Sequence, residues 1–247
     1  MRLGPIDHVL LLCPDLEHAV DSYCLALGQV VVARSQLAAR LALELGAANL
    51  AGRACVAVAS ALDQKPWLLL VENSQALAVS EPRPGWFGVQ LALDLAQLKL
   101  GAASGFTALE PRSLTPQPDA NAMQLLGPAN EVLWLRQRGI AAPTQPALFG
   151  AVLASSQPVL TRAFYQGLGA LDSVAAEHAL ALRGTHNLSF ITSGVAPSIE
   201  LAAPNACGIA AVAFARSNAA SERLDERYQT AAPQHLRGHA GELLILL

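Results

Sequence analysis

Histidine and glutamate side chains are the groups of this chain best suited to acid–base chemistry or metal binding. His8 follows Asp7 in an apolar segment, and an imidazole titrates near neutrality, so His8 could serve as a metal ligand or general base. The alternative is a histidine hydrogen-bonded to backbone or to Asp7. Glu200 could be a cavity carboxylate with a raised pKa, or a partnered or partly exposed one. His186, beside Asn187, could point into a second cavity.

Other catalytic patterns are missing from the sequence. His235 and His239 stand four apart, as two zinc ligands on one helix face can, but Gly238 interrupts such a helix. The chain has neither a glycine-rich phosphate loop nor a G-x-S-x-G nucleophile turn. Its four cysteines form no C-x-x-C pair and have no evident basic partner, which indicates buried free thiols in a cytoplasmic protein.

Three segments of the first half recur in the same order in the second half. The matching pairs are residues 23–28 (YCLALG) and 164–169 (FYQGLG), 46–50 (GAANL) and 184–188 (GTHNL), and 127–135 (GPANEVLWL) and 238–246 (GHAGELLIL). Ordered echoes indicate an internal duplication. Asn49 and Asn187 are therefore predicted to have matching structural roles, and Glu131 and Glu242 to be solvent-facing residues of equivalent hairpins.

The composition argues against several classes of protein. Of the 247 residues, 53% are hydrophobic and 14% charged, which predicts an extensive interior and an oligomeric surface, such as that of a homodimer. No apolar run reaches the roughly 18 residues of a membrane helix, and the amino terminus does not resemble a signal peptide. The net charge is −3 and basic residues do not cluster with aromatic ones, so neither a membrane nor nucleic acid is an expected partner.

Hydrophobic periodicity divides the chain into four units, each with a strand, a helix and further strands. The units begin at residues 6, 88, 148 and 208. In the first unit, residues 6–12 form a strand, Asp15 caps a helix over residues 16–27, and Gly28 ends it. The later strands are expected at residues 29–33, 39–45, 54–59 and 67–72, then at 88–93, 107–109, 122–126 and 131–136. Further helices are expected at residues 95–103, near Ser156, and at 219–228, with a linker at residues 139–147.

This order of elements resembles the vicinal oxygen chelate superfamily, which includes glyoxalase, bleomycin-resistance and extradiol dioxygenase proteins. The residues that carry the resemblance are Ile6-Asp7-His8-Val9, Pro14-Asp15-Leu16, Tyr23 with Leu27-Gly28, Phe164-Tyr165 with Leu168-Gly169, the turn at residues 127–131, and residues 184–187 with 199–201. The resemblance covers nearly the whole chain. It implies an α+β fold of two glyoxalase-like half-barrel domains, residues 1–138 and 148–247, each made of two βαβββ units.

The resemblance also implies where a metal would sit, held by His or Gln from first strands and Glu from last strands. The first-strand positions map to His8, Gly88, Phe149 or Gly150, and Ala211, and the last-strand positions to Leu69, Trp134, Glu200 and Ile245. Only His8 and Glu200 keep a donor, and pairing of units within each half would place them in different barrels. A shift of one or two residues would bring Gln90 beside His8, but a carboxylate would still be missing.

Two functional classes follow from this mapping. The first is a protein that binds a small apolar or aromatic molecule without a cofactor, with Trp67 and Trp134 either forming an aromatic wall or filling the core. Its ligand-binding candidates are His8, Trp67, Gln90, Trp134, Phe149, His186 and Glu200. The alternative is a lyase, isomerase or dioxygenase that uses Fe, Mn, Zn or Ni at a reorganised site around His8 or Glu200. A structural protein with collapsed cavities is a third possibility.

Overall fold

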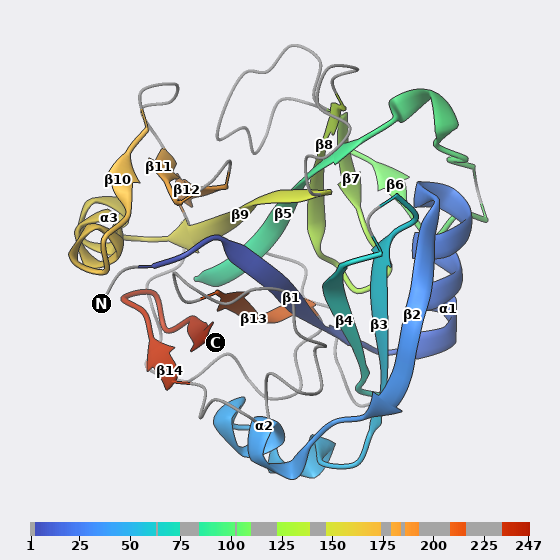
Figure 1. Cartoon of the computed structure of the whole chain (residues 1–247), viewed down its shortest axis with the longest axis horizontal. Coiled ribbons are helices and arrows are strands. Elements are labelled where there is room, and N and C mark those ends of the chain that lie inside the picture. Colours follow the sequence, from blue (N-terminus) through green and yellow to red (C-terminus); the bar gives the residue numbers. More distant parts are fainter. Residues whose placement is uncertain are drawn as a thin grey trace.

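The computed structural model describes residues 3–62, 64–74, 84–101, 103–109, 123–138, 147–173, 179–183, 186–192, 208–215 and 234–247. These residues form two mixed sheets of seven and eight strands with a few helices (Figure 1), so the predicted α+β architecture is confirmed. In the described part of the chain, no helix is long and apolar enough to cross a membrane. The cysteines described there, Cys13, Cys24 and Cys55, are free thiols, and Cys207 lies outside the described residues.

The first sheet has the strand order β14-β15-β13-β1-β4-β3-β2. Its strands are β1 (Ile6–Cys13), β2 (Gln29–Gln36), β3 (Ala54–Ser60), β4 (Pro66–Glu72), β13 (Gly208–Phe214), β14 (Gln234–Arg237) and β15 (Leu243–Leu246).

The second sheet has the order β10-β11-β12-β9-β5-β8-β7-β6. Its strands are β5 (Gly85–Leu93), β6 (Thr107–Ala108), β7 (Met123–Leu126), β8 (Val132–Gln137), β9 (Leu148–Ser155), β10 (Leu171–Asp172), β11 (Ala179–Ala181) and β12 (Asn187–Thr192).

Each sheet combines units from both halves of the chain. β1 of the first unit pairs antiparallel with β13 of the fourth, and β5 of the second unit pairs antiparallel with β9 of the third. The expectation that units pair within halves is therefore wrong for the sheets. The physical reason is that each first strand needs a neighbour on its free edge, and the hydrophobic pattern does not specify which first strand supplies it. The sequence boundaries of the two domains and the full set of four units stay predictions, since residues 139–146 and 219–228 lie outside the described residues.

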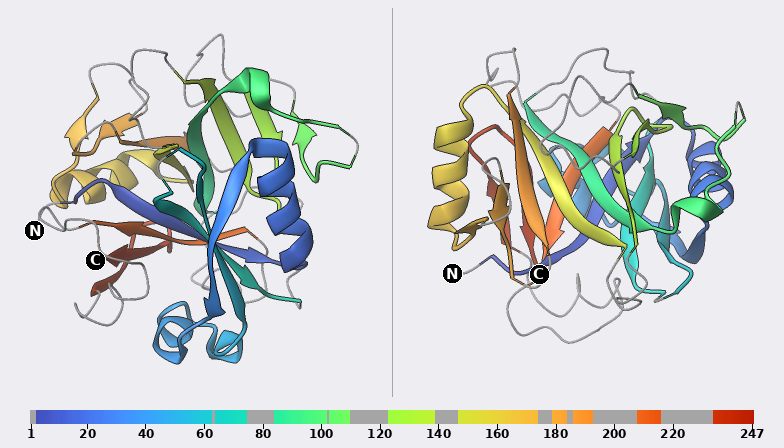
Figure 2. Two further views of the ribbon diagram at one scale, coloured as in Figure 1. Left: turned by 45° about the vertical axis from the view of Figure 1, so that its right-hand side comes forward. Right: turned by 90° about the horizontal axis from the view of Figure 1, so that it is seen from above.

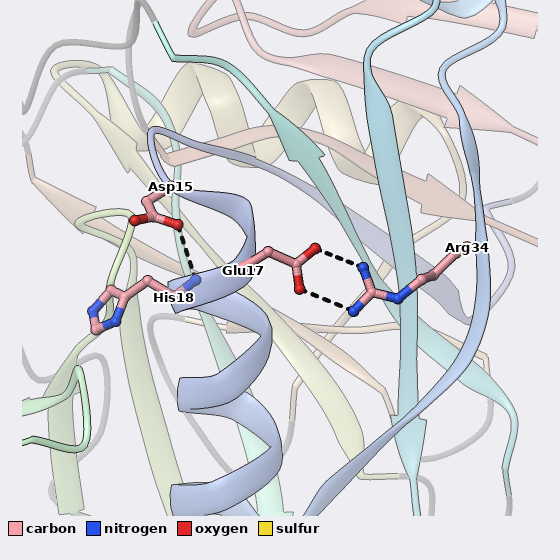
Figure 3. Close-up of polar contacts among 4 residues, drawn as sticks. All are labelled: Asp15, Glu17, His18 and Arg34. Atoms are coloured by element: carbon pink, nitrogen blue, oxygen red, sulfur yellow. Dashed lines mark hydrogen bonds and ion pairs between the residues drawn. The ribbon is translucent and has the colours of Figure 1, made fainter.

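The first helix shows how local sequence fixes an element. α1 (Leu16–Asp21) begins after Asp15, whose carboxylate accepts a hydrogen bond of 3.0 Å from an amide of the first turn (Figure 3). Glu17 joins the helix to β2 by accepting two hydrogen bonds from Arg34, of 2.6 and 3.0 Å, and these bonds lower the pKa of its carboxyl group. Gly28 ends the helical segment with a φ of +64°. The predicted cap and helix end are confirmed.

Two predicted elements differ in the structure. Residues 39–45 form a helix, α2 (Ala39–Glu44), and not the predicted strand. Leucines alternate there as in a strand, but alanine, leucine and glutamate are strong helix formers and their propensity prevails. The helix predicted at residues 95–103 is only a short turn. The short helical turns are Ser22–Ala26 with π geometry, and Ala48–Leu50 and Leu95–Gln97 with 3-10 geometry.

The two sheets pack against each other through a shared apolar core. Val9 and Leu11 of β1, with Val89 and Leu91 of β5, belong to this one buried cluster. α1 and α3 (Pro158–Gly167) lie at opposite ends of the molecule (Figures 1 and 2). α2 lies at the far side of the first sheet from the second sheet (Figure 1).

A buried tyrosine–glutamate pair recurs in the two halves and joins each helix to a later turn. Tyr23 donates to Glu131 and Tyr165 donates to Glu242, each with an oxygen–oxygen distance of 2.6 Å. The two glutamates are 2% and 4% exposed, so the prediction that they face solvent is wrong. Their second carboxylate oxygens accept bonds from amides of their own turns at 2.9 Å, which offsets part of the desolvation. Burial still raises the pKa of both carboxyl groups, that of Glu131 to about 7.

Candidate functional site

The two sheets can be compared residue by residue because their central strand pairs have the same irregularities. The register of β1 with β13 shifts after Leu10, and that of β5 with β9 shifts after Gln90. Leu10 is paired with Leu69 of β4, and Gln90 with Trp134 of β8. Directly paired residues on adjacent strands share a face of the sheet. Leu10 and Gln90 are therefore equivalent members of two rows of side chains.

The row in the first sheet is hydrocarbon throughout. It crosses β3, β4, β1, β13 and β15 as Ala57, Leu69, Leu10, Ala211 and Leu243. We call these five residues the apolar row. α2 packs on the same face, because its Leu41 and Ala42 belong to the same buried cluster as the row. This face of the first sheet is filled by its own side chains and by α2.

The equivalent row in the second sheet is polar. It crosses β7, β8, β5, β9 and β12 as Gln124, Trp134, Gln90, Gly150 and Asn187. We call these residues the amide row. On β7, β8 and β5 these side chains are buried: Gln124, Trp134 and Gln90 are only 3%, 5% and 6% exposed. Four of the five positions thus hold hydrogen-bonding side chains where the first sheet has alanine or leucine.

The amide row holds several polar atoms that have no hydrogen-bond partner among the described residues. Gln90 Nε2 donates to Ser189 Oγ at 3.1 Å. The buried atoms without a hydrogen bond are Gln90 Oε1, Gln124 Oε1, Asn187 Oδ1 and the indole nitrogen of Trp134. The oxygen and nitrogen of an amide are assigned from the bonding network, and turning the amide of Gln90 or Asn187 would place an N–H group of one opposite the oxygen of the other. Each unpaired buried group costs about 1–3 kcal/mol.

Two glycines provide the space that these side chains occupy. A Cβ atom at Gly150 would overlap both Gln90 Oε1 and Asn187 Oδ1, so these two oxygens converge above Gly150. A Cβ atom at Gly88 would overlap the indole ring of Trp134. Two carbonyl oxygens that converge without a donor repel each other, and a hydroxyl, amine or amide N–H placed between them would satisfy both.

The amide row presents neutral hydrogen-bonding groups. It offers unpaired carbonyl oxygens as acceptors and the Trp134 indole N–H as a donor. Apolar side chains surround it, and the Phe87 ring lies 6.1 Å from that of Trp134. An apolar surface with a few fixed polar groups is the usual composition of a small-molecule site.

The described residues of neither row fit a divalent metal ion. The amide row supplies neutral oxygens without a carboxylate or imidazole, and the apolar row supplies no donor atom. In the described part of the chain, no three His, Cys, Asp or Glu side chains are grouped so as to hold a metal. A dication needs anionic or imidazole donors to offset its desolvation.

His8 lies in the first sheet, two residues before Leu10. It is fully buried, and its Nδ1 is 2.9 Å from Asp7 Oδ2. Asp7 is also 3.3 Å from Lys65 Nζ. Gln90 is on the other sheet, so the two residues do not meet across one barrel. Of the two interpretations of His8 from the sequence, the hydrogen bond to Asp7 is therefore present.

Trp67 and His186 line a separate small cavity. They border a cavity of about 90 Å³ between the sheets, together with Asp7 and Lys65. Trp67 donates to Gln29 Oε1 at 2.9 Å and belongs to the shared core, so it does not form one wall with Trp134. Burial, and then the positive charge of Lys65, lower the pKa of His186 to about 4, and its imidazole is neutral at pH 7.

The last described strand of the third unit is β12, and this changes the mapping of Glu200. β12 runs parallel to β9, with Asn187 paired to Gly150. The residue of the third unit equivalent to Trp134 is thus Asn187, while Glu200 lies outside the described residues.

Phe149 is next to the amide row, and the guanidinium carbon of Arg136 lies 3.7 Å from its ring centroid. The matching roles predicted for Asn49 and Asn187 are wrong, since Asn49 lies in a 3-10 turn.

Sequence reasoning identified Gln90 and Trp134 but missed Gln124, Asn187 as a strand residue, and Ser189. The available signal was a polar side chain inside a short apolar strand, as in Met123-Gln124-Leu125-Leu126. Such a residue is costly to bury and therefore informative. The residues that lie beside Gln124 on other strands could not be identified without knowledge of which strands pair.

Comparison with known proteins gives the fold a context. No protein-family profile matches the sequence, and no curated protein sequence matches it. A putative dioxygenase from Bacillus subtilis matches with a TM-score of 0.62 and 14% identity, over 99% of this chain and 85% of the other. Glyoxalase I from Zea mays matches at 0.57 and 15%, over 98% and 91%, and the cppA protein from Streptococcus pneumoniae at 0.52 and 9%, over 99% of each. Identities this low establish the fold alone, and at that level the predicted resemblance is confirmed: this chain has the fold of the vicinal oxygen chelate proteins.

Proposed function

We propose that this protein binds a small organic molecule on the amide row of the second sheet, without a metal of the kind that the superfamily resemblance implies. The observation that carries the proposal is the group of unpaired polar atoms on Gln90, Gln124, Trp134 and Asn187. A ligand with hydroxyl or N–H donors and one acceptor would satisfy them, and an aromatic or apolar body would suit the surrounding side chains. These atoms are shielded from solvent, so entry of the ligand requires covering residues to move.

Tryptophan fluorescence tests the proposal directly. Small phenols and anilides, which combine an aromatic ring with hydroxyl or N–H donors, serve as probes. We expect binding to change the emission of the wild type and not that of Trp134→Phe, because the other indoles, Trp67 and Trp86, lie in the shared core. Gln90→Leu should weaken binding about tenfold or more, through loss of hydrogen bonds made in a buried site. Leu69→Met, a volume-conserving change in the apolar row, is the matched control and should bind as the wild type does.

The alternative function is a metal-dependent lyase, isomerase or dioxygenase with a reorganised site around His8 or Glu200. Elemental analysis of protein purified without chelator distinguishes the two proposals. Stoichiometric Fe, Mn, Zn or Ni that is lost in His8→Ala would contradict the metal-free proposal. Probe binding that is unchanged by exhaustive dialysis against chelator would support it.

A further inference from the structure

Arg138 is a buried cation beside the amide row, and no described residue neutralises it. It follows β8, its backbone N–H donates to Leu93 O at 2.8 Å, and its Nε donates to Ala92 O at 3.2 Å. Only 9% of the residue is exposed, and its Nη2 is buried without a hydrogen bond. Among the described residues, no carboxylate is within ion-pair distance of Arg138.

The acidic side chain that follows the neighbouring strand β5 is engaged elsewhere. Asp94, which follows β5, is exposed and accepts from the amide of Ala96 at 3.2 Å. The same carboxylate oxygen is 3.5 Å from Nε2 of Gln137. Asp94 therefore caps a helical turn on the surface. A guanidinium that is shielded from water and has no anion is costly, and an oxyanion is its natural partner because the planar group binds carboxylates through two parallel bonds.

A second arginine lies close to this position. Arg136 is paired in register with Ala92, the residue whose carbonyl accepts from Arg138. Its guanidinium carbon lies 3.7 Å from the centroid of the Phe149 ring, which fixes the side chain over an aromatic face. Two guanidinium groups thus occur at the carboxyl ends of β5 and β8.

This basic end continues the face that carries the amide row. Ala92 is two residues beyond Gln90 on β5, and Arg136 is two residues beyond Trp134 on β8, so all four positions share a face. Two residues of strand span about 7 Å. A molecule with a donor at one end and an oxyanion about one aromatic ring away could reach the amide row and the arginines together.

We infer that the ligand of the amide row is an organic anion, an aromatic or apolar body with a carboxylate at one end and a hydroxyl or amine at the other. The carboxylate pairs with Arg138, beside Arg136, and the donor group lies between the oxygens of Gln90 and Asn187. This inference rests on the proposed function and adds the charge of the ligand, which the neutral groups of the amide row do not determine.

The experiment compares 4-hydroxybenzoate with 4-hydroxybenzamide, which has the same shape without the charge, by calorimetric titration of the full chain. The wild type should bind the anion about tenfold or more tightly than the amide. Arg138→Gln should bind the two probes alike, and its ligand-free form should be at least as thermally stable as the wild type, because an unneutralised buried charge has been removed. Arg162→Gln, which changes an exposed arginine paired with Asp172, is the control and should keep the preference.

Each other result decides against the inference. Equal binding of the two probes by the wild type, with loss of both in Gln90→Leu, would overturn the anionic ligand and leave the proposed function standing. Failure of both probes to bind would overturn both. A preference that survives in Arg138→Gln would assign the charge to another group. Loss of folding in Arg138→Gln would mean that the fold itself uses the guanidinium, and the inference would fall.

Discussion

The apolar row and the amide row occupy equivalent positions in two sheets whose central strand pairs have matching registers. In the first sheet, Leu10 and Leu69 pack under α2, and the face is filled by the protein itself. In the second sheet, Gln90 and Trp134 hold these positions and leave polar atoms unpaired. The register shifts after Leu10 and Gln90 coincide, so the difference lies in the side chains and not in the backbone pairing.

This difference has opposite consequences for stability on the two faces. A face filled by hydrocarbon gains stability from burial, roughly 25 cal/mol per Å² of apolar area. A face that keeps unpaired polar atoms gives up stability, and such a cost is usual at sites that bind something else. Under the proposed function, the first sheet contributes stability and the second contributes recognition.

The largest effect is expected when the apolar row is given an amide. Leu10→Gln places an unpaired amide among Leu69, Ala211 and α2, and removes a well-packed side chain. We expect a loss of about 3 kcal/mol or more in the free energy of unfolding, measured by urea denaturation. Leu10→Met is the control and should cost less than about 1.5 kcal/mol. A loss below about 1 kcal/mol for Leu10→Gln would mean that the first-sheet face is open to water.

The tyrosine–glutamate pairs are the feature that the two halves should share. The folded-state pKa of Glu131 is raised to about 7, so the folded protein binds more protons than the unfolded chain between pH 4.5 and about 7. Stability should therefore fall as pH rises through this window. Glu131→Gln should remove roughly 1–3 kcal/mol of that fall, with unfolding measured from pH 5 to 8. Glu242→Gln should flatten the profile in the same direction, since burial also raises the pKa of that group. A steeper profile in either variant would contradict this account.

Much of the fold could be predicted from the sequence, because its signals are local. Asp15 and Gly28 gave the bounds of the first helix, and the ordered echoes predicted repeated units, although not which units share a sheet. The residues of α2 were predicted as a strand, in which alternating leucines would share one buried face. In the structure Leu43 is 67% exposed, so these leucines share no such face. Pairing of the first unit with the fourth depends on which strand edges meet, and no local pattern contains that information.

The candidate site was only partly predictable for the same reason. Gln90 and Trp134 were found by analogy to ligand positions, but the shift of one or two residues that would bring Gln90 beside His8 does not occur, since His8 lies in the other sheet. Asn187 was interpreted as a turn residue, because the last strand of the third unit was expected about a dozen residues later. Its position opposite Gly150 follows from the pairing of β12 with β9, and only this pairing brings the polar atoms together.

An intermediate effect is expected where the amide row is crowded. Gly150→Ala adds a methyl group where Gln90 Oε1 and Asn187 Oδ1 converge, and should cost about 1–3 kcal/mol of stability. In the background of Gln90→Ala the same change should cost less, because the space is then free, and the double-mutant cycle measures the difference. The equivalent change in the first sheet, from Ala211 to glycine, removes a methyl group and should show no coupling to Gln90. Additive costs at Gly150 and Gln90 would mean that the two residues do not share this space.

The smallest effect on stability is expected for Gln90→Leu, the mirror image of the change at Leu10. If the Gln90 amide is under-bonded, exchange for leucine loses one bond to Ser189 and removes an unpaired buried oxygen, and these terms nearly cancel. We expect a change within about 1 kcal/mol, together with loss of probe binding. A competing arrangement turns the Asn187 amide over, so that its N–H group donates to Gln90 Oε1 and the row closes on itself. In that case Gln90→Leu breaks a buried pair, leaves Asn187 unsatisfied, and costs about 1–3 kcal/mol. Urea denaturation of Gln90→Leu, Asn187→Leu and the double variant therefore distinguishes two states of the amide row. In one, its polar atoms are unpaired without a ligand. In the other, Gln90 and Asn187 pair with each other.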